Sequence, residues 1–239
     1  MWLTRSVKPF IFKNEYDGKL SFSDLDDLGL YVHIPFCERI CAFCPYCKTL
    51  YSKDALDSYV DALIREIHMA GAMCEGKKKV TSLYFGGGTP ALASHRLRDI
   101  ISALNEHFEI TEGIGLELHP DNVTVPVLSE LKACGVDKIS IGIQSFQEKY
   151  QDILGRKTVD ASALKQALSK VSFDTVSMDL IFALPGQTFE DLKKDVDMAF
   201  GSGANHVAIY PFIDFDFTPS DVKAMPKNRK RKLLKRKQT

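Results

Sequence analysis

The chain has 239 residues, of which 45% are hydrophobic and 26% are charged, with equal numbers of basic and acidic side chains. This length suits one α/β domain with a full hydrophobic core. The composition excludes disordered, collagen-like and disulfide-stabilised miniprotein classes. The charge is unevenly distributed, because residues 226–239 hold eight Lys or Arg and no acid. The rest of the chain is therefore acidic, with 23 basic against 31 acidic side chains.

No run of apolar residues approaches the length that a bilayer span needs. Charges and Pro9 interrupt the first 18 residues before the core of a signal peptide could form. We therefore expect a cytoplasmic protein. Thiols stay reduced in that compartment, where cysteines bind metals or act in catalysis more often than they form disulfides.

Strand and helix patterns alternate along the chain. Strands are predicted at 30–35, 80–85, 115–120, 138–144, 175–184 and 206–212. Helices are predicted at 54–70, 94–108, 126–134, around 160–170 and from 189 to about 200. The alternation predicts parallel strands joined by right-handed crossovers, in an open doubly wound sheet or an incomplete (β/α) barrel. Both architectures bind ligands at the carboxyl ends of the strands.

Four of the six cysteines are clustered directly after the first predicted strand. Cys37, Cys41 and Cys44 have CxxxCxxC spacing, and Cys47 follows closely. Thiolates so close along one loop can face a common metal centre. A structural zinc site would normally draw on a second, distant pair, whereas the two remaining cysteines are isolated. The spacing therefore favours an iron–sulfur cubane in which one iron stays open to a substrate or cofactor.

Two further motifs flank this loop. Residues 86–90 read GGGTP and follow the second predicted strand, where bare Cα atoms allow close approach of the backbone to a ligand. Tyr31 and His33 alternate along the first strand and so share one of its faces. We expect that face to reach a ligand if it lines the interior of a barrel. A buried aromatic side chain and a hydrogen-bonded core histidine remain the alternative.

These motifs together resemble the radical S-adenosylmethionine (radical SAM) superfamily, in particular the branch of oxygen-independent coproporphyrinogen III oxidase (HemN) and the haem chaperone HemW. The resemblance covers residues 29–218. Six motifs carry it in order: YVHIPFCxxxCxxC (31–44), LYFGGGTP (83–90), ELHP (117–120), GVDKISIGIQSF (135–146), LGR (154–156) and DLIFALPGQT (179–188).

The resemblance implies a partial (β/α)6 barrel of parallel strands without a recognisable C-terminal lid domain. It divides the chain into an N-terminal extension (1–24), a radical SAM core domain (25–218) and a basic tail (219–239). We expect the tail to be a solvated chain end, with a nucleic-acid contact or attachment to a partner as the alternatives. Nucleic acid is not an expected partner of the domain.

The resemblance also implies two cofactors, a [4Fe-4S] cluster and S-adenosylmethionine. It assigns the cluster to Cys37, Cys41 and Cys44. The residues implied in binding S-adenosylmethionine are Tyr31, Phe43, Gly86, Gly87, Gly88, Thr89, Glu117, Gln144, Arg156 and Asp179. Cys47 departs from the oxidase branch, whose further cysteine stands one residue closer. It is a substitute ligand, a thiol near the substrate or a passive neighbour.

The activity implied is reductive cleavage of S-adenosylmethionine to a 5′-deoxyadenosyl radical, which abstracts hydrogen from a substrate. A tetrapyrrole substrate is expected, as for a coproporphyrinogen III oxidase, with a reduced flavodoxin- or ferredoxin-like protein as the electron donor. Three alternatives remain open. They are a haem-binding chaperone without oxidase turnover, a radical SAM methyltransferase, and a truncated, non-catalytic remnant.

Overall fold

The computed structural model describes residues 25, 27–74, 76–216, 218 and 222–226. The predicted N-terminal extension and most of the basic tail therefore lie outside the described residues. The main sheet contains β1 (Asp27–Ile34), β4 (Lys78–Gly87), β5 (Phe108–Ile110), β6 (Ile114–Leu118), β7 (Val136–Gln144), β8 (Thr175–Phe182) and β9 (His206–Pro211). A short second pair consists of β2 (Phe36–Cys37) and β3 (Thr49–Leu50).

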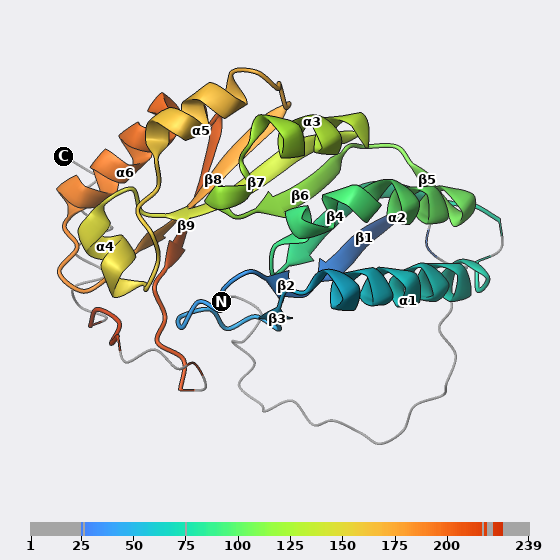
Figure 1. Cartoon of the computed structure of the whole chain (residues 1–239), viewed down its shortest axis with the longest axis horizontal. Helices are drawn as coiled ribbons and strands as arrows, with labels where there is room; N and C mark the ends of the chain where they lie inside the picture. The colour runs from blue at the N-terminus through green and yellow to red at the C-terminus, as the bar shows by residue number, and fades with distance from the viewer. Residues whose placement is uncertain (1–24, 26, 75, 217, 219–221, 227–239) are drawn as a thin grey trace.

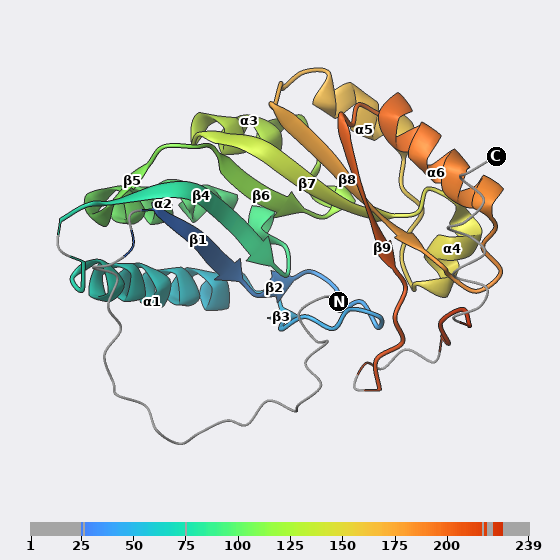
Figure 2. The ribbon, with the colours of Figure 1, turned by 180° about the vertical axis from the view of Figure 1, so that it is seen from behind.

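The sheet has the order β1-β4-β6-β7-β8-β9, with β5 paired to β4, and every pair is parallel. The helices are α1 (Lys53–Gly71), α2 (Ser94–His107), α3 (Val125–Ala133), α4 (Glu148–Ile153), α5 (Ala161–Leu168) and α6 (Phe189–Gly201). Successive helices follow the outer side of a curved sheet, as Figure 1 and the reverse view in Figure 2 show. This arrangement confirms the predicted partial barrel of parallel strands.

Alternation along β7 shows how the sheet separates the core from the site. Ile139, Ile141 and Ile143 are at most 2% exposed and pack into the hydrophobic core. The intervening Ser140 and Gly142 face the opposite side, where they line a cavity. One strand thus supplies both core and site, because successive side chains of a strand point to opposite faces.

Local signals fix the helix starts. Ser52 caps α1, since its side chain accepts a hydrogen bond from the amide of Ala55 at 3.3 Å. Thr188 and Asp191 form a reciprocal capping box at the start of α6. Caps of this kind satisfy amides that the first turn of a helix leaves unpaired. The start of α6 is therefore well defined.

The structure differs from the predicted elements at the ends of two strands and in two short helices. The strand predicted at 175–184 ends at Phe182, because Ala183 adopts a left-handed φ of 67°. The strand predicted at 115–120 ends at Leu118, and Pro120 opens the 3₁₀ helix Pro120–Asn122. The helix α4 and a second 3₁₀ helix, Pro90–Ala93, were not predicted.

The last described residues pack on the sheet. Val222 and Ala224 contact an apolar cluster that includes Tyr150 and Phe212. The amide of Met225 donates a hydrogen bond to the carbonyl of Ala183 at 3.4 Å. Within the described part of the chain, none of the helices has the length and apolar character that a membrane crossing requires.

Candidate active site

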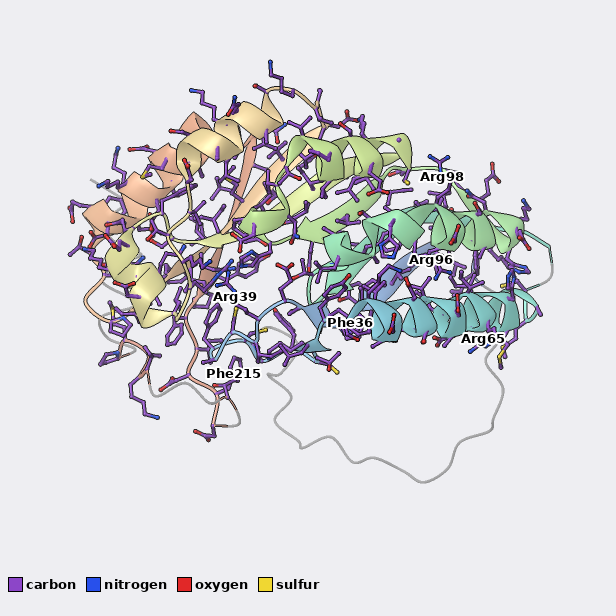
Figure 3. All side chains as sticks on the ribbon, in the orientation of Figure 1. Phe36, Arg39, Arg65, Arg96, Arg98 and Phe215 are labelled. Atoms are coloured by element: carbon purple, nitrogen blue, oxygen red, sulfur yellow. The ribbon has the colours of Figure 1, made fainter. Side chains whose placement is uncertain are left out.

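A cavity of about 550 Å³ opens at the carboxyl ends of the strands. Its walls come from β1, the loop 38–48, the end of β4, and the strands β6 to β9. We call residues 37–48, which begin with the last residue of β2, the cluster loop. Arg39 of this loop and Phe215 after β9 both line the cavity, and they lie near one another on the same side of the sheet in Figure 3. The cavity thus brings together segments from most of the chain.

The cluster loop is closed at its base by the short pair β2–β3. The amide of Thr49 donates to the carbonyl of Pro35 at 2.7 Å, and the amide of Tyr51 donates to the carbonyl of Cys37 at 2.9 Å. Inside the loop, the amide of Cys44 donates to the carbonyl of Cys41 at 3.2 Å. Backbone hydrogen bonds therefore hold Cys37, Cys41 and Cys44 in one compact segment on the cavity wall.

The glycine-rich segment is joined directly to this loop. The amide of Gly88 donates to Ile34 at 2.9 Å, and that of Thr89 donates to Phe36 at 2.7 Å. A Cβ atom at Gly88 would lie 2.5 Å from the Phe36 carbonyl oxygen and 2.9 Å from the Cys37 Sγ. Only glycine allows this approach, so Gly88 sets how closely the loop packs against the end of β4.

The thiols of the cluster loop fit a metal cluster by their chemistry. All six cysteines of the chain are free, and three of them with the predicted spacing line one cavity. Burial raises the pKa of the Cys37 and Cys41 thiols. The Arg156 guanidinium acts in the opposite direction on Cys41, because a cation favours the thiolate. The site therefore offers three thiols and a neighbouring cation that favours the thiolate of Cys41.

Arg156 is the most deeply placed cation of the site. Its guanidinium donates to the carbonyl of Gly142 at 2.8 Å and contacts the Nε2 of His119. Burial and Arg156 together lower the pKa of His119 to about 4, so this imidazole is neutral at physiological pH. Arg39 forms an ion pair with Asp121 at 2.9 Å on the same wall.

Two carboxylates line the same cavity, Glu117 from β6 and Asp179 from β8. Glu117 accepts a hydrogen bond from the amide of Gly87 at 3.2 Å, and Asp179 accepts one from the Ser140 hydroxyl at 3.0 Å. Burial raises the pKa of both carboxyl groups, and the charge of Asp179 raises that of Glu117 further. The cavity therefore holds negative charge at a cost in folding stability, as a cation-binding site would.

Glu117→Gln tests this cost. The raised pKa means that the folded state favours the protonated acid, so stability is lost as pH rises from about 4.5 through the folded pKa. The amide removes this loss. At pH 7 we therefore expect the cofactor-free variant to be more stable than the wild type and to have a higher Tm.

Thermal unfolding of both proteins between pH 4 and pH 8 measures the effect. The gain should shrink towards pH 4, where the acid is protonated in both states. Glu109→Gln removes an exposed glutamate from β5 of the same sheet and should leave the Tm unchanged. A Glu117→Gln variant that is less stable than the wild type at pH 7 contradicts the argument.

Tyr31 and His33 share the cavity face of β1, as expected from their alternation. The Tyr31 hydroxyl lies 3.3 Å from the Nδ1 of His33, and the Nε2 of His33 lies 3.1 Å from the Cys47 carbonyl oxygen. Both contacts are hydrogen bonds if Tyr31 and Nε2 donate. Cys47 is thus held through its backbone, and its side chain is exposed at the cavity.

Gln144 ends β7 in a left-handed conformation, with φ of 71°. The segment after it is anchored by Asp195 of α6, a carboxylate that is fully buried. Asp195 accepts hydrogen bonds from the Ser145 hydroxyl at 2.7 Å and from the Phe146 amide at 3.0 Å. Gln151 of α4 adds a bond to the Ile143 carbonyl at 2.9 Å. Neither Asp195 nor Gln151 stands in a motif that predicts a place in the site.

Nearly all predicted site residues line the cavity. Those that line it are Tyr31, Cys37, Cys41, Phe43, Cys44, Gly87, Gly88, Thr89, Glu117, Gln144, Arg156 and Asp179. Gly86 is not part of the lining. A Cβ atom there would lie 2.8 Å from the ring of Tyr31, so Gly86 makes room for that side chain instead. The roles of the predicted site residues in binding the cofactors stay predictions, which their arrangement does not test.

Several known proteins are similar to this chain in sequence and in fold. The haem chaperone HemW of Lactococcus lactis is 33% identical over 193 residues, which are 79% of this chain and 50% of that protein. The anaerobilin synthase of Escherichia coli O157:H7 is 35% identical over 196 residues, which are 80% of this chain and 44% of that protein. The chain spans about half the length of the curated relatives it matches.

Comparison of the fold with solved structures points to the same group of proteins. Coproporphyrinogen III oxidase (HemN) from Escherichia coli, a radical SAM enzyme, superimposes with a TM-score of 0.78 and 26% identity, covering 88% of this chain and 51% of that one. Residues 31–199 match the Radical SAM superfamily. That superfamily uses a [4Fe-4S] cluster and S-adenosylmethionine, the two cofactors that the motifs imply. The chain belongs to the radical SAM superfamily and, within it, to the group that contains HemN and HemW.

Proposed function

We propose that this chain binds a [4Fe-4S] cluster through Cys37, Cys41 and Cys44, cleaves S-adenosylmethionine reductively, and acts on a tetrapyrrole. One observation carries the proposal. The three thiols line the same cavity as the glycine-rich segment and the charged residues Glu117 and Arg156. When bound, the cluster and S-adenosylmethionine supply reductive formation of a 5′-deoxyadenosyl radical. The protein holds and orients both, and excludes water and oxygen.

The charges of the cavity suit S-adenosylmethionine, which carries a sulfonium, an ammonium and a carboxylate. Glu117 provides an anion for the positive groups, and Arg156 can pair with the carboxylate. Asp179 and Gln144 offer acceptors and donors to the ribose hydroxyls. The backbone at Gly87 and Gly88 lets the amino group approach closely. Each role follows from charge and hydrogen-bonding capacity.

The outer part of the cavity supports a tetrapyrrole. Tyr46, Tyr210 and Phe215 line it and offer flat apolar surface, of which Tyr46 and Tyr210 are 68% and 54% exposed. Arg39 and Lys157 line the same region and can pair with carboxylates. A macrocycle that is flat and carries acidic side groups matches both features. The names of two relatives, coproporphyrinogen III oxidase (HemN) and the haem chaperone HemW, refer to a porphyrinogen and to haem.

The test is an anaerobic assay of the cluster-loaded chain with S-adenosylmethionine and dithionite, followed by 5′-deoxyadenosine quantification. Cys41→Ala serves as the control without a cluster. Product that depends on Cys41 supports a radical enzyme, and its increase on addition of coproporphyrinogen III supports oxidative decarboxylation. Replacing dithionite by reduced flavodoxin or ferredoxin tests the proposed electron donor. A cluster-loaded chain that yields no 5′-deoxyadenosine contradicts the catalytic proposal.

A haem chaperone is the second candidate, favoured by the 33% identity to the L. lactis chaperone. It requires stoichiometric haem binding without consumption of an organic substrate. Titration with haem, followed by absorbance, distinguishes this candidate from the oxidase. Mass spectrometry of the tetrapyrrole after turnover detects a methyl transfer, the third possibility. A cytoplasmic location, where thiols stay reduced, belongs to the same proposal.

A further inference from the structure

Three potential metal ligands meet at the end of the α1–α2 pair that lies away from the cluster loop. They are His68 in the last turn of α1, and Glu106 and His107 at the end of α2. Their ligand atoms all lie within 4.8 Å of one another. We propose that these residues form a second metal site, which binds a divalent transition metal such as Zn²⁺ and joins the ends of the two helices.

The distances agree with such a site. The Nδ1 of His68 lies 2.9 Å from the Nε2 of His107 and 3.7 Å from the Oε2 of Glu106. Two ligands at about 2.0–2.1 Å from a tetrahedral Zn²⁺ stand about 3.3 Å apart. The two imidazoles therefore need to separate by only a few tenths of an ångström, and the metal replaces the proton that they share. Two His and one Glu leave a fourth position for water.

The electrostatics of the helix ends favour a cation. His68 and His107 both lie in the last turn of their helix, where backbone carbonyls carry partial negative charge. The Lys77 ammonium already binds the carbonyl of Asn105 there, at 2.6 Å. Two helix ends that converge on one point add to the charge of Glu106. A bound cation would be stabilised by all three.

The backbone is shaped around one of the ligands. Gly71, the last residue of α1, faces the ring of His107, and a Cβ atom there would lie 2.1 Å from the His107 Cγ. The His107 ring thus occupies the space that any larger residue at Gly71 would need. This contact fixes His107 against α1, so one ligand is positioned before a metal binds. The side chains of His68 and Glu106 are 42% and 64% exposed.

The proposed site is remote from the three cysteines assigned to the cluster. His68 is 16 residues after Ser52, the cap of α1 next to the cluster loop. At 1.5 Å per residue, it lies about 24 Å along the helix. Arg65, labelled in Figure 3, marks the part of α1 just before His68. A metal there would hold together α1 and α2, which pack against each other beside the first strands. It would leave the cluster untouched.

Calorimetric titration of the cluster-loaded protein with Zn²⁺ tests the proposal. We expect one Zn²⁺ per chain, with the iron content unchanged. His68→Gln and Glu106→Gln alter exposed side chains and should weaken the affinity at least tenfold, whereas His95→Gln is the matched control. His95 pairs with Asp57 at 2.9 Å on the same two helices but lacks a second imidazole.

Two results would overturn the inference. One is Zn²⁺ binding that His68→Gln and His107→Ala both leave unchanged, which would place the metal elsewhere. The other is no heat of binding at millimolar Zn²⁺. Titration of a variant with Cys37, Cys41, Cys44 and Cys74 changed to Ser checks that neither the cluster thiols nor the thiol at the end of α1 supplies the signal. Co²⁺ added to that variant should give the visible spectrum of nitrogen and oxygen ligands without thiolate charge transfer.

Discussion

Replacing Cys41 by alanine should abolish both iron binding and 5′-deoxyadenosine formation, and Cys37→Ala and Cys44→Ala should do the same. The three thiols lie in the compact cluster loop, and they are the only ligands assigned to the cluster. Losing one leaves a second iron without a protein ligand. Iron and sulfide content after anaerobic reconstitution, with the absorbance of the cluster near 400 nm, measures the effect before any activity assay.

Cys47→Ala is the matched control for these variants. Cys47 lines the same cavity, but its ordered contact is through the carbonyl oxygen that faces His33. Alanine keeps that carbonyl. We expect full iron content and undiminished cleavage of S-adenosylmethionine in this variant. Loss of iron would make Cys47 a ligand, whereas intact cleavage with loss of substrate turnover would make it a thiol that meets the substrate.

Asp195→Ala should lower the free energy of unfolding by about 3 kcal/mol or more, since a hydrogen bond to a charged group contributes about 1.5–3 kcal/mol. The substitution leaves the Ser145 hydroxyl and the Phe146 amide buried without their acceptor. A loss of this size is a large fraction of the stability of a domain. Chemical denaturation of the cofactor-free protein measures it directly.

Asp197→Ala provides the comparison from the same helix. Asp197 pairs with Lys193 across one turn, and both side chains are more than 60% exposed. Exposed pairs contribute little, so this variant should change stability by less than about 0.5 kcal/mol. Asp195→Ala should also weaken S-adenosylmethionine binding, because it releases the segment next to Gln144. Equal stability of the two variants would contradict the role given to Asp195.

Much of the fold could be predicted because the strands and the long helices carry their own periodicity. The buried positions of β7 alternate, and those of α1 recur at helical spacing. The helix α4 lacks such a signal. It is only six residues long, and it is held by the buried Gln151 and by the hydroxyl of Tyr150, which donates to Asp191 at 2.8 Å. Contacts with distant segments determine whether such a short helix forms, so the local sequence does not reveal it.

The residues of the candidate site also fall into two groups, those that sequence motifs reveal and those that they do not. Residues proposed to carry the chemistry, such as Cys41 and Glu117, stand in motifs at strand ends and could be found from the sequence. Residues that hold them in place could not. Asp195 interacts with a segment 50 residues earlier and resembles any acid of an amphipathic helix. The orientation of Gln144 depends on a left-handed backbone conformation, which is usual for glycine. Because the residue is not a glycine, the sequence does not indicate this conformation.

The strand order of the sheet has a consequence for biosynthesis. Each later strand of the main sheet pairs with a strand that was made earlier, so the sheet can grow from β1 as the chain leaves the ribosome. Cys37 precedes Tyr210, on the last strand of the cavity, by 173 residues. At about 5–20 residues per second, roughly 10 to 35 s separate their synthesis. The cysteines therefore emerge while one wall of the cavity is still missing, which gives the machinery that delivers iron and sulfide an open route to them.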